Sequence, residues 1–321
     1  MKAINSQIIS SGSYLPKKIL TNFDLEKTVD TTNDWIIERT GINQRHIAAD
    51  GEMTSDIGYF AAKNALEKAG LKPEDIEMIV VATTTPDLTF PSTATIIQAK
   101  LGATKCFAFD VQAVCSGFVY ALGIANNFIK TDQVKNTLVI GADILSRIVN
   151  WQDRNTCVLF GDGAGAVVLS ATENSSSGIL ATKLYSDGSL NAILNTSGGI
   201  AASQTAGFIQ MQGKEVFKHA VEKMSKSVVD VLAKVGLETK DIDWLIPHQA
   251  NARILSSVAK KLGLSEEKVI MTVSNHANTS AASIPLALDF ALQNNKIKKG
   301  DIVVFEALGG GLTWGAVVIR W

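Results

Sequence analysis

The sequence has few residues of the kinds that crosslink a chain, bind metals or anchor a protein in a membrane. Its 321 residues contain three cysteines, Cys106, Cys115 and Cys157, without the paired spacing of a metal site. Such a small, odd number is typical of a protein kept in a reducing compartment. We find no uncharged apolar run of about 18 residues and no signal-peptide core. We therefore expect a cytoplasmic protein with no membrane span and no metal.

The charges are balanced, so the chain has no overall attraction to a polyanion. There are 30 Lys and Arg against 31 Asp and Glu, a formal net charge of −1. This balance gives no general pull toward nucleic acid or a membrane, and an electrostatic partner would have to use a local patch. With 46% hydrophobic and 19% charged residues, the composition is that of a soluble globular protein.

Hydrophobic periodicity indicates alternating strands and helices, an α/β chain. Residues 76–82 are apolar nearly throughout, as in a strand covered on both faces. We predict strands over 4–10, 76–82, 108–114, 137–141, 243–246 and 269–273, and a hairpin of 157–160 with 164–170. We predict helices over 21–29, 32–39, 53–69, 91–101, 116–129 and 250–262.

The second half of the sequence repeats patterns of the first half in the same order. The matched pairs are Leu66-x-Lys68-x-Gly70-Leu71 with Leu232-x-Lys234-x-Gly236-Leu237, Leu138-Val139-Ile140 with Ile302-Val303-Val304, and Gly165-Ala166-Val167-Val168 with Gly315-Ala316-Val317-Val318. Three matches in register predict two similar α/β halves, which we place at residues 1–171 and 172–321. Two sheets packed about a pseudo-twofold axis would bury the apolar helix 116–129 between them.

Cys115 is the first candidate functional residue, because it lies where a predicted strand gives way to a helix. The N-terminal end of a helix favours a thiolate, so we expect a lowered pKa. His248 follows the strand 243–246, and Asn278 follows the strand 269–273 and begins a small-residue helix. Asn278 is thus predicted to hold the place in its half that Cys115 holds in the first. Each residue alone could be structural, and His276 competes with His248, but together they suggest a nucleophile with polar helpers.

The sequence resembles a known family, β-ketoacyl-[acyl-carrier-protein] synthase III, which has a thiolase-like fold. The motifs that carry the resemblance are Trp35–Ile42, Val111-Gln112-Ala113-Val114-Cys115-Ser116-Gly117, Leu159–Ala166, Met211-Gln212-Gly213, Pro247-His248-Gln249-Ala250-Asn251, His276–Ala282 and Gly309-Gly310-Gly311-Leu312-Thr313-Trp314-Gly315. They span nearly the whole chain, with Ala277 where many relatives have glycine. The resemblance implies two pseudo-symmetric halves with central helices between two mixed sheets.

The resemblance also implies a role for each motif in the condensation of an acyl group with malonyl-[acyl-carrier-protein]. Cys115 would take an acyl group, most simply acetyl, from acyl-CoA, and His248 and Asn278 would stabilise the enolate formed by decarboxylation. The backbone N–H groups of Cys115 and Gly310 would form the oxyanion hole. No cofactor is implied, since acyl-CoA is a substrate.

The same resemblance assigns binding residues. CoA would contact Trp35, Arg39, Arg154, Gly213 and Asn251. The acyl pocket would consist of Leu145, Phe160, Met211 and Phe90, with Phe90 supplied by the partner subunit of a homodimer. Acyl carrier protein would contact Gln249, Arg253, Lys218, Lys260 and Lys261. Arg253, Lys260 and Lys261 share one face of the helix 250–262, a basic patch that suits an acidic carrier.

Other functions remain open. Gly161-Asp162-Gly163-Ala164-Gly165 is not a nucleotide phosphate loop, because a strand rather than a helix follows it. A thiolase-fold condensing enzyme of secondary metabolism is the main alternative. A hydrolase that uses Cys115 and His248 would need the histidine placed to deprotonate the thiol. A catalytically silent interaction protein would not need the intact Cys, His and Asn.

Overall fold

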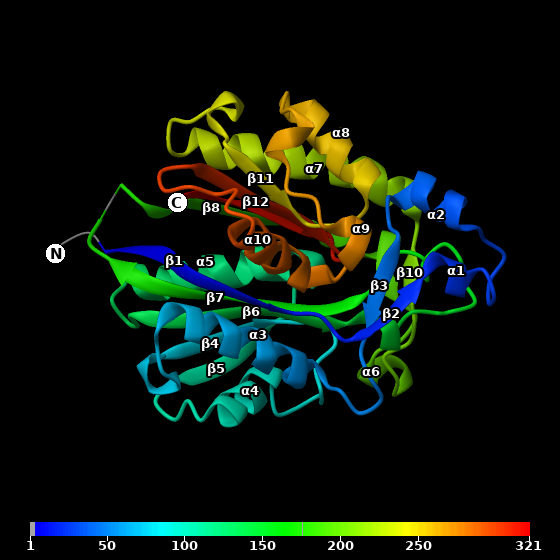
Figure 1. The fold of residues 1–321 in the computed structure, drawn as a ribbon, viewed down its shortest axis with the longest axis horizontal. Helices are drawn as coiled ribbons and strands as arrows, with labels where there is room; N and C mark the ends of the chain where they lie inside the picture. Colours follow the sequence, from blue (N-terminus) through cyan, green and yellow to red (C-terminus); the bar gives the residue numbers. More distant parts are fainter. Residues whose placement is uncertain (1–3, 175) are drawn as a thin grey trace.

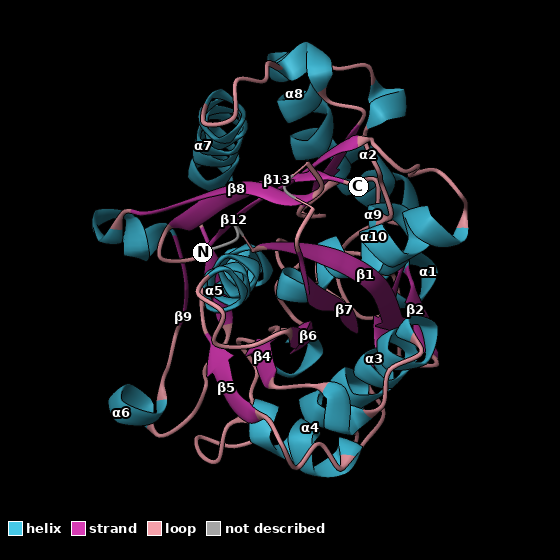
Figure 2. Ribbon diagram, turned by 90° about the vertical axis from the view of Figure 1, so that its left-hand side faces the viewer, coloured by secondary structure: helices cyan, strands magenta, loops and turns pink. Residues whose placement is uncertain are grey.

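The protein consists of two mixed sheets and three helical layers in the order α–β–α–β–α (Figures 1 and 2). The computed structural model describes residues 4–174 and 176–321. The five-stranded sheet has the order β1 (Asn5–Tyr14), β7 (Asp162–Thr172), β6 (Asn136–Ile144), β4 (Met78–Ala82), β5 (Phe107–Val111). The four-stranded sheet has the order β11 (Trp244–Pro247), β12 (Ile302–Gly309), β13 (Thr313–Arg320), β8 (Gly178–Ser186).

Two helices lie between the sheets, and two pairs cover the outer faces (Figure 2). The central helices are α5 (Gly117–Lys130) and α10 (Ser283–Gln293). The outer helices are α3 (Thr54–Ala69) and α4 (Thr93–Leu101) on one side and α7 (Gly213–Ala233) and α8 (Ala252–Leu262) on the other. This is the thiolase-like arrangement that the sequence predicts.

The strand β4 shows why its sequence does not alternate between apolar and polar residues. Val80 packs into the core that contains α5, whereas Ile79 and Val81 pack into the core under α3 and α4. All five residues of β4 are buried. A strand covered on both faces needs apolar side chains at every position.

Shorter elements gather at one end of the layers (right in Figure 1). They are β2 (Lys18–Thr21), α1 (Asn22–Leu25), α2 (Asn33–Thr40), β3 (Gln44–Ile47), β9 (Leu194–Thr196), α6 (Ile200–Ser203), β10 (Ile209–Met211) and α9 (Val273–His276). The helix predicted over residues 21–29 is a single turn, α1, capped by the Thr21 side chain.

Two further predictions about secondary structure are wrong. Residues 157–159 form a turn rather than one arm of a hairpin, and β7 pairs with β6 and β1 instead. Residues 269–273 form no strand beyond one bridge between Leu245 and Val269. The backbone N–H groups of Thr272 and Val273 donate to the Gln249 side chain, so they are not available for a ladder of strand hydrogen bonds.

The strands of the two main sheets come from successive parts of the chain. The five-stranded sheet contains β1 and β4 to β7, all from the first part of the chain. The four-stranded sheet contains β8 and β11 to β13, all from the second part. The strand β7 ends at Thr172 and β8 begins at Gly178. The boundary between residues 171 and 172 stays a prediction, since α10 of the second half packs against β1 and β7 of the first.

Candidate active site

One large cavity, of about 1090 Å³, opens at the end of the layers where the short elements gather. It is lined by Cys115, His248 and Asn278, which come from three separate parts of the chain. Eight other predicted site residues also line it: Arg39, Leu145, Phe160, Met211, Gly213, Asn251, Arg253 and Gly310. The fold therefore brings most of the predicted site together.

Cys115 lies in a tight turn, Val114–Ser116, directly before α5, and its side chain is buried. Gly309 backs onto this turn so closely that a Cβ there would lie 2.7 Å from the backbone nitrogen of Cys115. Only glycine fits such an approach.

The prediction of a lowered Cys115 pKa is wrong for the free protein. Burial raises the pKa of the Cys115 thiol to about 12, and the negative charge of Asp143 acts in the same direction. The Ser280 hydroxyl and the backbone N–H of Cys115 oppose this shift without offsetting it. In the free protein, burial therefore favours the neutral thiol over the thiolate.

The turn that contains Cys115 has a counterpart in the second half, but Asn278 is not at the matching position. Val114 has φ 48° and Ser280 has φ 50°, and each lies in a short turn that leads into a central helix. Ala281 therefore matches Cys115, and Asn278 lies three residues before that position. The predicted equivalence of Cys115 and Asn278 is wrong.

His248 follows β11 and is held as a neutral imidazole. Its Nδ1 lies 2.8 Å from Ser283 Oγ, and the same oxygen accepts a hydrogen bond from Gln249 N at 3.3 Å. Burial lowers the pKa of His248 to about 3. In the tautomer in which Ser283 Oγ donates to Nδ1, the N–H of His248 lies on Nε2.

Asn278 is oriented by hydrogen bonds on its backbone and its side chain. Its Oδ1 accepts from Ser280 N at 2.9 Å, which leaves the Nδ2 amide as a donor. Its backbone N donates to Leu159 O, and its carbonyl accepts from Gly161 N. His248 and Asn278 therefore bring a neutral imidazole and a side-chain amide to the cavity that Cys115 also lines.

Gln249 is wrongly predicted as a contact for a carrier protein. Its side chain is fully buried. The amide nitrogen donates to Pro247 O and Ile270 O, and the amide oxygen accepts from Thr272 N and Val273 N. Gln249 thus ties the His248 loop to the segment before α9 and has no surface for a partner.

His276, the competing histidine, does not line the cavity. Burial lowers its pKa to about 4, with the neighbouring His46 acting in the same direction. His248 is therefore the histidine of this site.

Trp35 and Arg154 lie outside the cavity lining and form an aromatic–cation cluster with Arg39. The guanidinium carbons of Arg39 and Arg154 lie 5.5 Å and 5.2 Å from the centroid of the Trp35 ring. A flat base inserted between Trp35 and Arg154 needs about 7 Å, two van der Waals contacts of about 3.5 Å. Arg154 would have to leave its hydrogen bond to Asp30 O to admit such a base.

The remaining predicted residues lie on the surface. Lys218, Lys260 and Lys261 are exposed to solvent. Arg253 is exposed too, and it also lines the cavity. Phe90 is 83% exposed and does not line the cavity of its own chain.

Within the described residues, no helix is long and apolar enough to cross a membrane, and we find no cluster of His, Cys, Asp or Glu suited to a metal.

The sequence analysis missed one wall of the cavity. This wall comes from the region around β9 and β10 and from the first turns of α7. Its residues are Asn191, Leu194, Asn195, Thr196, Ile209, Lys214, Val216, Phe217, Ala220 and Met224. The motif Met211-Gln212-Gly213, immediately before α7, is the one sequence signal that pointed to this wall.

Comparison with known proteins shows the family to which the chain belongs. Two family models match, 3-oxoacyl-[acyl-carrier-protein] synthase III over residues 109–188 and the C-terminal part of the same synthase over residues 232–321. The β-ketoacyl-[acyl-carrier-protein] synthase III of Ehrlichia canis is 58% identical over 98% of this chain and 99% of its own length, and that of Rhodospirillum centenum is 56% identical over 99% of both chains. The crystal structure of the Aquifex aeolicus 3-oxoacyl-[acyl-carrier-protein] synthase III has a TM-score of 0.94 at 50% identity, with 98% of this chain and 100% of that chain covered. The chain therefore belongs to the β-ketoacyl-[acyl-carrier-protein] synthase III family of condensing acyltransferases.

Proposed function

We propose that the protein transfers an acyl group, most simply acetyl, from acyl-CoA to Cys115 and condenses it with malonyl-[acyl-carrier-protein]. The product is a 3-ketoacyl-[acyl-carrier-protein], as in the initiating step of fatty acid synthesis. The observation that carries the proposal is one cavity lined by a buried thiol, a neutral imidazole and an amide, from Cys115, His248 and Asn278.

In the first half-reaction, the Cys115 sulfur attacks the thioester carbon of acyl-CoA and CoA leaves. We assign the oxyanion to the backbone N–H groups of Cys115 and Gly310, because the glycine-rich turn at 309–311 approaches the Cys115 turn closely. In the second, the malonyl thioester loses CO₂, and the resulting enolate oxygen accepts from His248 Nε2 and Asn278 Nδ2. The enolate carbon then attacks the acyl group on Cys115. The protein's side chains and backbone and the two substrates supply every group that these steps use, so the proposal calls for no cofactor.

The geometry disfavours a cysteine hydrolase. Such an enzyme needs a histidine that takes the thiol proton and is oriented by a carboxylate or an amide. The orienting group of His248 is the Ser283 hydroxyl, and burial holds the pKa of His248 far below neutrality.

The test is incubation with labelled acetyl-CoA, followed by malonyl carrier protein, with mass analysis of protein and product. We expect an acetylated Cys115 peptide and then a 3-ketoacyl carrier. Release of free acetate without condensation would favour the hydrolase. Condensation with malonyl-CoA but not with the carrier would favour an enzyme of secondary metabolism.

We also propose that the protein is a homodimer that pairs through β5. This strand is the edge of the five-stranded sheet (Figure 2). Phe107 is 46% exposed on it, and its ring stacks with Phe109 at a centroid distance of 6.3 Å and lies tilted against Phe128 at 5.7 Å. An exposed edge strand with apolar side chains favours pairing with a second copy. Such pairing would also cover Phe90, which we assign to the acyl pocket of the partner subunit.

Replacing Phe90 by alanine is expected to broaden the range of starter groups. If its ring limits the partner's acyl pocket, its removal admits longer acyl-CoA thioesters. The measurement compares acylation rates from acetyl- to octanoyl-CoA, with gel filtration to check that the variant is still dimeric. A dimeric variant with the wild-type chain-length profile would remove Phe90 from the pocket.

Reversing the charge of Arg253 is expected to weaken the use of malonyl carrier protein and to spare acylation from acetyl-CoA. Arg253, Lys260, Lys261 and the nearby Lys218 form the exposed basic surface that we assign to the acidic carrier. Charge reversal lowers the association rate, and the loss shrinks with salt because the Debye length falls from about 10 Å at 0.1 M to about 3 Å at 1 M.

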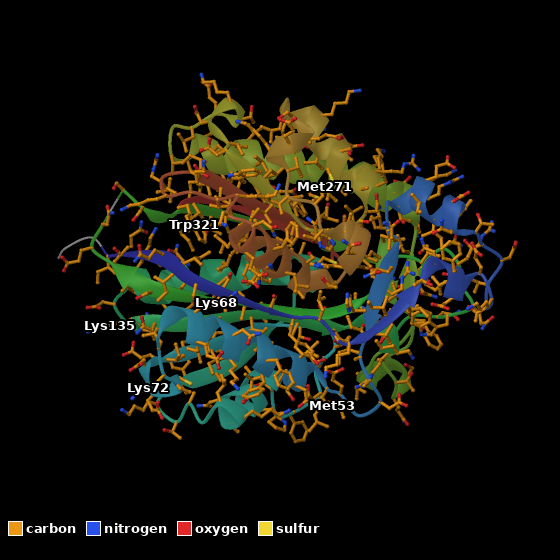
Figure 3. The ribbon with its side chains drawn as sticks, in the orientation of Figure 1. Met53, Lys68, Lys72, Lys135, Met271 and Trp321 are labelled. Atoms are coloured by element: carbon orange, nitrogen blue, oxygen red, sulfur yellow. The ribbon has the colours of Figure 1, made fainter. Side chains whose placement is uncertain are left out.

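The measurement is the rate of each half-reaction for Arg253→Glu at low and high salt. Lys299→Glu is the matched control, since Lys299 is exposed and the next residue, Gly300, donates its N–H to Trp321 O, at the part of the molecule away from α2 and α8 (Figures 1 and 3). Equal losses in both half-reactions, or no effect of salt, would assign Arg253 to CoA or to the fold.

A further inference from the structure

A buried acid that the mechanism does not use, Asp143, lies at the end of β6. Its side chain is fully buried and does not line the cavity. Oδ1 accepts hydrogen bonds from Thr84 N at 2.7 Å and Thr85 N at 3.2 Å, and the hydroxyls of Thr83 and Thr85 donate to the same oxygen at 3.2 Å and 3.1 Å. Oδ2 accepts from Ala281 N at 3.2 Å. The carboxylate therefore joins the segment after β4 to a turn from the C-terminal part of the chain.

This turn, Ser280–Ala282, sets the orientation of Asn278. Ser280 N donates to Asn278 Oδ1 at 2.9 Å, which leaves the Nδ2 amide as the donor. Ser280 has φ 50°, a left-handed conformation that a residue other than glycine keeps only when the surrounding structure holds it. The next backbone N–H, of Ala281, is the one that Asp143 accepts. Asp143 thus holds the turn one residue beyond the group that orients Asn278.

The strand β6 contacts the same turn at a second point. Gly141 lies two residues before Asp143, on the same face of the strand, and a Cβ there would lie 2.2 Å from Ala281 O. The strand therefore fixes the turn by a hydrogen bond at residue 143 and by close backbone contact at residue 141. The position of the Asn278 amide depends on both contacts.

The turn that contains Cys115 is held by different groups, although the two turns pack on each other. Ser116 N and Ser116 Oγ both donate to Ala113 O, at 3.1 Å and 2.7 Å. Ser116 Oγ also lies 2.7 Å from Thr313 Oγ1. None of these contacts involves β6. The nucleophile and the amide assigned to the enolate therefore have separate supports, and a change at one can be distinguished from a change at the other.

We propose that Asp143 is a positioning residue for the condensation step, which holds Ala281 N and so fixes the turn that directs the Asn278 amide to the enolate oxygen. This inference rests on the proposed function. In this role Asp143 neither contacts substrate nor transfers a proton. It keeps Nδ2 in place for a developing charge, where a displacement of about 1 Å can lower a rate about 10²-fold. Acylation of Cys115 does not use Asn278, so it does not need this support.

The test is Asp143→Asn, which exchanges one heavy atom. Four hydrogen bonds reach Oδ1 and one reaches Oδ2, so the asparagine is expected to turn its oxygen to the threonines and its NH₂ group to Ala281 N–H. The bond to the turn is then lost, and the bonds to the segment after β4 are kept. We expect condensation of the acylated protein to fall about 10- to 100-fold in kcat, with little change in KM for malonyl carrier protein. Acylation from acetyl-CoA should stay near the wild-type rate.

A double variant shows whether Asp143 acts through Asn278. If it does, adding Asp143→Asn to Asn278→Ala should cost no further condensation activity, because the amide that Asp143 positions is already gone. Two independent defects would instead multiply their losses. That outcome, or parallel losses of both half-reactions in Asp143→Asn alone, would overturn the proposal.

Asp162→Asn is the matched control. Asp162 is also fully buried, at the start of the neighbouring strand β7, and it accepts from Ala48 N, Ser146 N and Ser146 Oγ, none of which lines the cavity. Its replacement should lower the melting temperature without changing the ratio of the two half-reaction rates. A selective loss of condensation in Asp162→Asn would assign the effect to buried carboxylates in general and contradict the proposal.

Gly141→Ala decides the question if Asp143→Asn does not fold. The added Cβ pushes Ala281 away from β6 and leaves the carboxylate unchanged, so condensation should again fall while acylation continues. A folded Gly141→Ala that condenses at the wild-type rate would show that the turn needs no support from β6. Wild-type protein that is acylated but forms no 3-ketoacyl carrier would contradict the proposed function instead.

Discussion

Replacing Cys115 by serine is expected to abolish acyl transfer to the protein. A serine hydroxyl is a far weaker nucleophile than a thiolate unless a base removes its proton. His248 is a weak base because burial lowers its pKa, and we assign it to the enolate of the condensation step. Loss of the nucleophile costs about 10⁶-fold in enzymes of comparable chemistry. The measurement is the intact mass of the protein after incubation with labelled acetyl-CoA.

The two other cysteines provide matched controls. Cys106 and Cys157 are also buried and free, and neither lines the cavity. Cys106→Ser and Cys157→Ser should therefore still be acylated at Cys115. Label that persists in Cys115→Ser and maps to either of these residues would disprove the assignment of the nucleophile.

Replacing His248 or Asn278 by alanine is expected to remove condensation while acylation continues. Each residue supplies one N–H donor to the enolate, and loss of one such donor typically lowers the rate by about 10²- to 10³-fold. The measurement compares the acylation rate of Cys115 with the rate of 3-ketoacyl carrier formation in the same variant.

Asn278→Asp is the sharper variant at this position. It keeps an oxygen to accept from Ser280 N, so the turn is retained, but it replaces the Nδ2 donor by an acceptor. We expect it to acylate and to fail at condensation at least as severely as Asn278→Ala. If the His248 and Asn278 variants lose both half-reactions in parallel, the two residues do not act in the decarboxylation step as proposed.

Local patterns in the sequence predicted much of the fold because burial acts residue by residue along a strand or a helix. The apolar residues 78–82 are buried on both faces, and the repeated patterns of the two halves become matching strands, such as β6 and β12 or β7 and β13. The turn before α5 that presents Cys115 is a local feature of this kind.

The predictions that failed concern groups whose partners are distant in the sequence. The segment 269–273 has strand-like residues, but its N–H groups are taken by Gln249, more than 20 residues earlier. The same contacts bury Gln249, which the sequence placed at a partner surface. The cavity wall around β9, β10 and α7 has no local chemical signature, because its residues are ordinary until the fold places them opposite Cys115.

The sequence by itself determined the α/β fold class and the family, and it predicted Cys115, His248 and Asn278 as a set. Only the tertiary structure decided how deeply Cys115 and His248 are buried, which raises the pKa of Cys115 and lowers that of His248. The helix end predicts a low pKa for Cys115, but the pKa depends on how many distant segments exclude water from the thiol and on the charge of Asp143. The effects of burial and of nearby charges on a pKa come from all the groups that surround the thiol in space. Most of these groups are distant in the sequence, so the residues next to Cys115 do not predict its pKa.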